Sequence, residues 1–200
     1  MKEPSAVRTL YTPREAYVIY YRAVRMMPSF FRAKKRGVLR DDFIERLMLA
    51  VTEVNGCAMC SYAHTKMALE SGMSIGEIEN LLSGDRSDVP PEELPAVLFA
   101  QHYADSRGRP SKEAWRSAAD FYGEAKSLAI LGAIRIIMLG NAYGIPAGSL
   151  IRRMSPKRSV DPRSGIGYEL VMLLSSVVFF PFVVLQALGA KVLHISPVNF

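Results

Sequence analysis

The chain has 200 residues, of which 50% are hydrophobic and 22% are charged. This length is enough for one domain with a full hydrophobic core, and this composition excludes a mostly disordered chain. The formal net charge is +6, but the basic residues are scattered or occur in short groups, which favours a solvated basic surface over a nucleic-acid site.

The start of the chain has no uninterrupted apolar segment followed by a small-residue cleavage site, so it does not predict a secretory signal. We therefore expect a cytoplasmic protein, in which thiols stay reduced and a structural disulfide is not expected. A cysteine pair in such a protein is more often catalytic or metal-binding.

The pattern of apolar residues predicts an all-α fold without strands. The first helix starts with Thr12 as N-cap, Pro13 at the first helical position and Glu15 placed for a capping box. The second helix ends at Asn55-Gly56. The predicted helices cover residues 12–27, 40–54, 57–72, 74–84, 90–108, 111–123 and 124–144, with glycine closing each of the last five.

We divide the chain into a helical domain, residues 1–150, and a tail, residues 151–200. The tail opens with a segment rich in basic residues, proline and serine, which is typical of a linker. Leu170 to Ala190 is an uncharged run of 21 residues, with Pro181 near its middle. That length meets the criterion for a membrane-spanning helix.

Two interpretations of the tail stay open. Basic residues cluster before the uncharged run, whereas only Lys191 closely follows it, so a spanning helix would keep the domain in the cytoplasm. The basic residues before the run are Arg152, Arg153, Lys157, Arg158 and Arg163. The alternative is a helix buried in an oligomer interface. We favour the interface, and leave open membrane association through residues 170–190.

The two cysteines of the chain, Cys57 and Cys60, stand three positions apart, and His64 follows four positions later. If Cys57 begins a helix, Cys60 and His64 lie within about 60° of it around the axis, at roughly 100° per residue. The helix N-terminus favours thiolate, and a neighbouring histidine can accept the proton. A nucleophilic thiol pair requires this arrangement.

Two other interpretations of the cysteines remain. They can be small apolar fillers in a core. They can also bind zinc together with His64, but three ligands are one fewer than a structural zinc site needs. His102 and His194 are distant and have no neighbour at ligand spacing.

Glu45 stands twelve positions before Cys57. Glutamate, eleven residues, Cys-x-x-Cys, three residues and histidine resembles the signature of the AhpD-like alkylhydroperoxidases, in the carboxymuconolactone decarboxylase superfamily. The likeness covers about residues 38 to 145, including the short predicted helix after the thiol segment and the three helices that follow it.

The resemblance implies a thiol peroxidase with an all-α, AhpD-like fold. Cys60 would attack the peroxide, and Cys57 would resolve the sulfenic acid as a disulfide. His64 and Glu45 would relay the proton, and an electron-donor protein or a dithiol would restore the thiols. No metal or cofactor is implied. The family also implies a homo-oligomer, as a dimer, trimer or hexamer.

One departure affects this expectation. Well-studied relatives place a histidine immediately before the second cysteine, whereas this chain has Met59 there. General thiol–disulfide exchange is therefore a stronger alternative, and a non-catalytic helical scaffold is the rival from another class. Decarboxylation is disfavoured, because decarboxylases of the superfamily lack the thiol pair.

Three further features complete the expectations. Glu53 competes with Glu45 as the site carboxylate, but we interpret it as a solvated helix position. Asn141 is expected to form part of a helix C-cap. Residues 127–140 are apolar nearly all round, which requires burial on more than one side and favours an oligomer.

Overall fold

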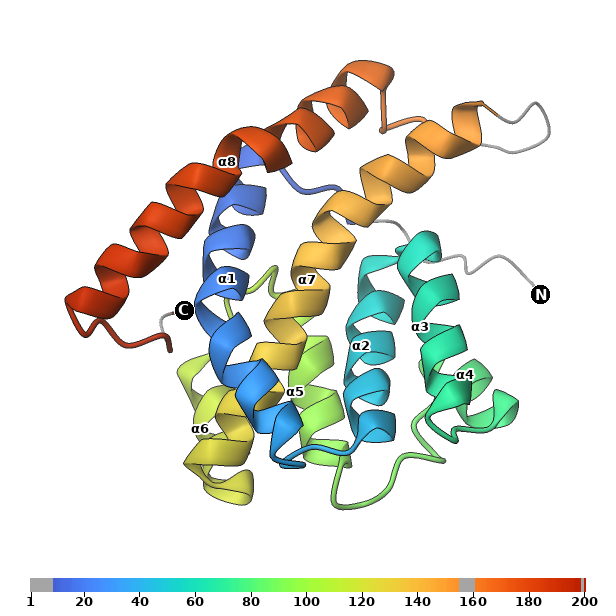
Figure 1. Ribbon diagram of the computed structural model, residues 1–200. Helices are drawn as coiled ribbons and strands as arrows, with labels where there is room; N and C mark the ends of the chain where they lie inside the picture. Colours follow the sequence, from blue (N-terminus) through green and yellow to red (C-terminus); the bar gives the residue numbers. More distant parts are fainter. Residues whose placement is uncertain (1–8, 155–160, 199) are drawn as a thin grey trace.

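The computed structural model describes residues 9–154, 161–198 and 200, and every regular element among them is an α-helix (Figure 1). The all-α prediction is confirmed. Lys157 and Arg158 of the predicted basic linker lie outside the described residues. The helices are α1 (Pro13–Lys35), α2 (Asp41–Asn55), α3 (Ala58–Glu70), α4 (Ile75–Leu82), α5 (Leu94–Asp105), α6 (Lys112–Tyr122), α7 (Glu124–Arg153) and α8 (Ile166–Val192).

Helix α1 begins as predicted, with reciprocal hydrogen bonds between Thr12 and Glu15, but it is longer than predicted. It continues through Pro28 to Lys35. A proline inside a helix costs about 3 kcal/mol. Packing of α1 along α7 offsets this cost: Phe30 is buried so closely against Gly132 that a Cβ on the glycine would stand 2.9 Å from the Phe30 Cβ.

Helix α7 is the centre of the bundle, and it corrects two expectations. It does not close at Gly144 but continues through Pro146 to Arg153, so Asn141 is a buried residue inside the helix and not part of a C-cap. The most apolar 18-residue stretch of α7 is 72% buried. It is covered by contacts with α1, α2, α3, α5, α6 and α8. The apolar surface of residues 127–140, which favoured an oligomer, is therefore mostly covered by other helices of the same chain.

Helix α8 is continuous and contains the whole uncharged run, including Pro181. It lies across α1 and α7 (Figure 1). The Tyr17 ring meets the Phe179 ring edge-on, and the Tyr17 hydroxyl donates to Gln186 Oε1 at 2.8 Å. Only 11% of the most apolar 18-residue stretch of α8 is buried. Both α7 and α8 are long and apolar enough to cross a membrane, but only α8 is largely uncovered.

The position of the thiol helix follows from α2. Helix α2 packs on α5 and α7, and α3 packs in turn on α2, α4 and α7. Helix α8 contacts only α1 and α7 among the described helices, so these two stand between α8 and α3 (Figure 1).

Candidate active site

The turn between α2 and α3 places both cysteines. Gly56 adopts a left-handed conformation, with φ 68° and ψ 32°, which ends α2 where the Asn55-Gly56 pair predicted. Cys57 follows as the N-cap of α3, one position before the helix, and not as its first residue. Its Sγ accepts a hydrogen bond from the backbone N–H of Cys60 at 3.3 Å. The sulfur of Cys57 therefore does what a serine or aspartate side chain does at other N-caps.

Cys57 and Cys60 are joined by a disulfide, with their Cα atoms 5.3 Å apart. This separation lies inside the range in which two cysteines can be bridged without moving the backbone. Cys57 is 1% exposed and Cys60 is 8% exposed. The pair can thus close within the folded turn, and Cys60 is the more exposed residue of the two.

Helix α7 covers the disulfide with a glycine. A Cβ on Gly144 would stand 2.7 Å from Cys60 Sγ, 2.9 Å from Cys57 Sγ and 3.4 Å from Met59 Cε. One turn further on, a Cβ on Gly148 would be 3.6 Å from Met59 Cβ. Sequence reasoning took Gly144 for the end of a helix and missed this contact. The signal was a glycine inside an apolar helical run, where it costs about 1 kcal/mol relative to alanine unless packing requires it.

Glu45 and His64 form the second part of the site. Glu45 lies on α2 and His64 on α3, and Glu45 Oε2 is 2.7 Å from His64 Nδ1. The Glu45 side chain is 5% exposed and the His64 side chain 17%. In the tautomer that carries its proton on Nδ1, the ring donates to this carboxylate and leaves Nε2 as the acceptor. His64 is four residues after Cys60 on the same helix, so the two side chains are neighbours on one face.

Arg46, next to Glu45, holds α2 in place. Its guanidinium forms a buried ion pair with Glu93, and a second one with Glu77 at 3.5 Å. Burial raises the pKa of Glu93, and the charge of Arg46 opposes this rise. These contacts fix the register of α2 against α4 and α5, and with it the place of Glu45.

Glu53, the competing carboxylate, is directed elsewhere. It is half-buried and not solvated as expected, and its Oε2 accepts from Gln101 Nε2 at 3.3 Å. Burial raises the pKa of Glu53. The structure thus pairs Glu45, and not Glu53, with His64.

A buried polar set lies between α2 and α7. The Tyr11 hydroxyl donates to Asn55 Oδ1 at 2.7 Å, and Thr52 Oγ1 donates to Asn141 Oδ1 at 3.3 Å. Burial raises the pKa of Tyr11 well above its ordinary value, so this phenol stays a hydrogen-bond donor. Asn141 Nδ2 is buried and has no hydrogen-bond partner in the described part of the chain. Asn55 immediately precedes the Gly56 turn, so this set fixes the end of α2 that presents Cys57.

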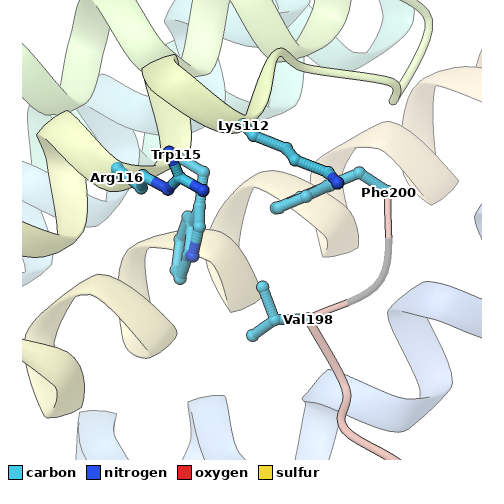
Figure 2. Close-up of a pocket in the computed structure, with 5 residues that line it drawn as sticks. All are labelled: Lys112, Trp115, Arg116, Val198 and Phe200. Carbon is cyan, nitrogen blue, oxygen red and sulfur yellow. The ribbon is translucent and has the colours of Figure 1, made fainter.

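Two further features of the described residues lie apart from this site. Within the described ranges, no three His, Cys, Asp or Glu side chains group so that they could hold a metal ion. A surface pocket is lined by Lys112, Trp115, Arg116, Val198 and Phe200 (Figure 2). None of these residues belongs to α2 or α3, so the pocket is separate from the thiols.

Comparison with known proteins adds the family. The model of the carboxymuconolactone decarboxylase family matches residues 24–102, a range that includes Glu45, Cys57, Cys60 and His64. The alkyl hydroperoxide reductase AhpD of Gluconacetobacter diazotrophicus is 38% identical over 71 residues, covering 30% of this chain and 39% of that protein. The chain thus spans well under two thirds of this relative. No solved structure matches. Over the matched region, this chain is therefore similar to the carboxymuconolactone decarboxylase family and to AhpD.

Proposed function

We propose that this protein is a thiol-dependent peroxidase that uses Cys60 and Cys57, with His64 and Glu45 moving the proton. The observation that carries the proposal is the joint placement of two pairs on α2 and α3. Cys57 and Cys60 can form a disulfide at the start of α3, and a buried carboxylate orients a histidine one turn further along the same helix. The similarity to the carboxymuconolactone decarboxylase family and to AhpD supports an enzyme of this type.

The chemistry balances with a peroxide and a dithiol. His64 Nε2 takes the proton of the Cys60 thiol, and the thiolate attacks one peroxide oxygen. The O–O bond breaks, Cys60 becomes a sulfenic acid, and the leaving alkoxide takes up the proton to depart as an alcohol. The Cys57 sulfur then attacks Cys60 Sγ and releases water as the disulfide forms. A dithiol reductant returns two electrons and two protons by thiol–disulfide exchange.

The roles of the two thiols rest on competing physical effects. The helix N-terminus and the N–H of Cys60 both favour thiolate on Cys57. Cys60 is nearer to His64 in the helix and is the more exposed residue of the two. We assign peroxide attack to Cys60, because a specific base outweighs a helix-terminus effect of about 1 kcal/mol.

Thiol titration of the reduced protein with a small excess of hydroperoxide tests the proposal. Both thiols should disappear together and give one intramolecular disulfide. The Cys57→Ser variant should accumulate a sulfenic acid that a dimedone-type probe traps, whereas Cys60→Ser should not react. Thiols that stay intact in the wild type would overturn the peroxidase proposal, and an inert Cys57→Ser variant would reverse the two roles.

General thiol–disulfide exchange is the second candidate, and Met59 favours it. Its side chain lies beside Gly144, against the disulfide, where relatives place a proton-carrying histidine. Rapid exchange with a disulfide substrate, combined with slow reaction with hydroperoxides, would select this function over the peroxidase.

The partners and the location follow from the same proposal. We propose a dithiol or electron-donor protein as reductant, a cytoplasmic location and a homo-oligomeric state. The exposed apolar residues Met59, Tyr62, Met67, Leu69 and Ile75 on α3 and α4 offer a surface for the reductant or for another copy of the chain.

A further inference from the structure

Helix α8 differs from an ordinary surface helix, because its exposed side is apolar and its buried side includes polar residues. The buried stripe toward α1 and α7 includes Glu169 and Ser175 beside Met172, Val183 and Ala190. Glu169 is held by Arg153, whose Nε lies 2.9 Å from Glu169 Oε2. A helix that only covered a soluble domain would place its apolar stripe inside and its polar residues outside.

The outer face of α8, facing away from α1 and α7, is apolar from Ile166 to Leu188. Leu174, Val177 and Leu185 on it are 64%, 73% and 68% exposed. At roughly 100° per residue, its exposed apolar positions spread over about 200° of the helix circumference. No Asp, Glu, Lys or Arg occurs between Leu170 and Ala190. Something apolar therefore has to cover more than half of this helix.

A second copy of the chain fits this face poorly. One packed helix covers an apolar stripe of roughly 100° and would leave much of the outer face in water. Protein interfaces also have a polar rim. The polar side chain between Val177 and Leu188 is Gln186, and its Oε1 already accepts from Tyr17. A lipid phase covers a full half-cylinder and needs no polar partner.

Both ends of α8 are held on the same domain, which distinguishes a helix lying in the membrane plane from a spanning one. Arg153 binds Glu169 at the first end. Beyond the second end, the Arg25 guanidinium donates to the carbonyl oxygen of Ser196 at 3.1 Å, and Arg135 donates to that of Pro197 at 2.7 Å. Val198 and Phe200 lie beside Trp115, with the rings of Phe200 and Trp115 5.7 Å apart (Figure 2). A spanning α8 would separate these contacts by a bilayer.

We propose that α8 is an in-plane membrane anchor whose outer face enters the boundary between lipid headgroups and acyl chains. Amphipathic helices bind membranes in this way by burying their apolar face at that depth. Lys191 is exposed in the last turn of α8, and the chain carries a net charge of +6, so an anionic lipid surface is the matching partner. The anchor replaces both interpretations that the sequence left open, and it does not depend on the thiol chemistry.

Flotation of the full-length protein with vesicles of phosphatidylcholine and phosphatidylglycerol tests the anchor. The wild type should float with the vesicles. Val177→Glu combined with Leu185→Glu should lower the partition coefficient by more than about ten-fold, because both charges would enter the apolar layer. The matched control is Phe31→Glu combined with Phe121→Glu, which changes two residues of similar exposure (58% and 57%) on α1 and α6. It should float like the wild type, and circular dichroism should show both variants folded.

Three results would overturn the proposal. The first is a wild-type protein that stays in the aqueous fraction and is an oligomer by light scattering, while the α8 double variant is a monomer. This result would make α8 an interface between copies of the chain. Another is equal flotation of the two double variants. The third concerns a variant whose only cysteine is Ser196→Cys, because Cys57→Ser and Cys60→Ser remove the other two. This variant is bound to the outside of vesicles and labelled there. An impermeant maleimide should label it at once, and protection until the vesicles are lysed would show a spanning helix.

Discussion

Gly144 of α7 and Cys60 of α3 approach so closely that a Cβ on the glycine would lie 2.7 Å from the sulfur. Real Cβ atoms do not show such contacts, and the other atom within 3 Å is the second sulfur of the disulfide. The approach of α7 to the thiol helix therefore requires a residue without a side chain at this position.

Gly144→Ala should destabilise the oxidised protein. The added methyl group overpacks the disulfide, which costs about 1–3 kcal/mol and exceeds the gain of about 1 kcal/mol in helix propensity. Gly140→Ala on the same helix is the matched control, since its Cβ would meet only Ile137 Cδ1, at 3.7 Å. Chemical denaturation of both variants, oxidised and reduced, measures the effect. The reduced form should lose less stability, because the side chains of free thiols can rotate away from the added methyl group. Equal stabilities of the two oxidised variants would contradict the contact.

Glu45→Gln and His64→Gln should each slow oxidation of the thiols by hydroperoxide by about 10²-fold, the lower range for loss of a general base. The Glu45 carboxylate orients the ring through Nδ1, and an amide holds it less firmly. Stopped-flow rates across pH measure both variants, with Glu53→Gln as the control carboxylate on α2. Three variants with the wild-type rate at every pH would remove the relay from the mechanism.

The ion pair of Glu15 and Arg107 should make the free energy of unfolding depend on pH in the acidic range. Hydrogen bonds from Arg107 lower the pKa of Glu15 from 4.5 to about 2. Because the folded-state pKa lies below the unfolded one, this stabilisation is complete above about pH 4.5 and is lost as pH falls toward 2. Glu15→Gln keeps the capping box but removes the charge. It should lower the free energy of unfolding by about 1 kcal/mol at neutral pH, allowing for solvent screening, and by nothing near pH 2. Urea denaturation at several pH values checks this, and a constant difference would exclude the ion pair as its source.

Replacing Glu169 should release the first end of α8. Its side chain is fully buried and accepts from both Arg153 and Ser164. Glu169→Leu leaves these donors without an acceptor, which costs about 2 kcal/mol. Hydrogen exchange should accelerate along α8 and stay unchanged in α2 and α3. Joint replacement of Arg153 and Glu169 by Met should be milder, because no charge stays unpaired. Uniform acceleration over the whole chain would show that α8 does not open on its own.

Local signals predicted the helix starts well. The capping box of Thr12 with Glu15 forms as expected, because a cap depends on residues within one turn, and Ser74 forms a second one with Glu77. Gly56 ends α2 because its left-handed conformation is also a local property. Most of the fold could therefore be predicted from short stretches of sequence.

The remaining features depend on contacts between distant segments. Gly56 and Gly144 look alike in sequence, but one ends a helix and the other lets a disulfide approach the middle of one. Pro28 stays helical because α1 is packed along α7. The 2.7 Å contact of Glu45 with His64 joins two helices, and only a family spacing indicated it. The disulfide itself was not expected as a structural bond in a cytoplasmic chain, although it was expected as a catalytic intermediate.

The placement of α1 and α7 between α8 and α3 has a consequence for which peroxides can reach the thiols. With lipid along the outer face of α8, Cys60 and Met59 would face the aqueous side of the anchored protein. A hydroperoxide still held in the bilayer by its acyl chain would not reach Cys60, whereas a small peroxide diffusing out of the membrane would. A soluble dithiol donor would approach from the same direction. The anchor would then determine where peroxides are intercepted, without presenting whole lipids to the thiols.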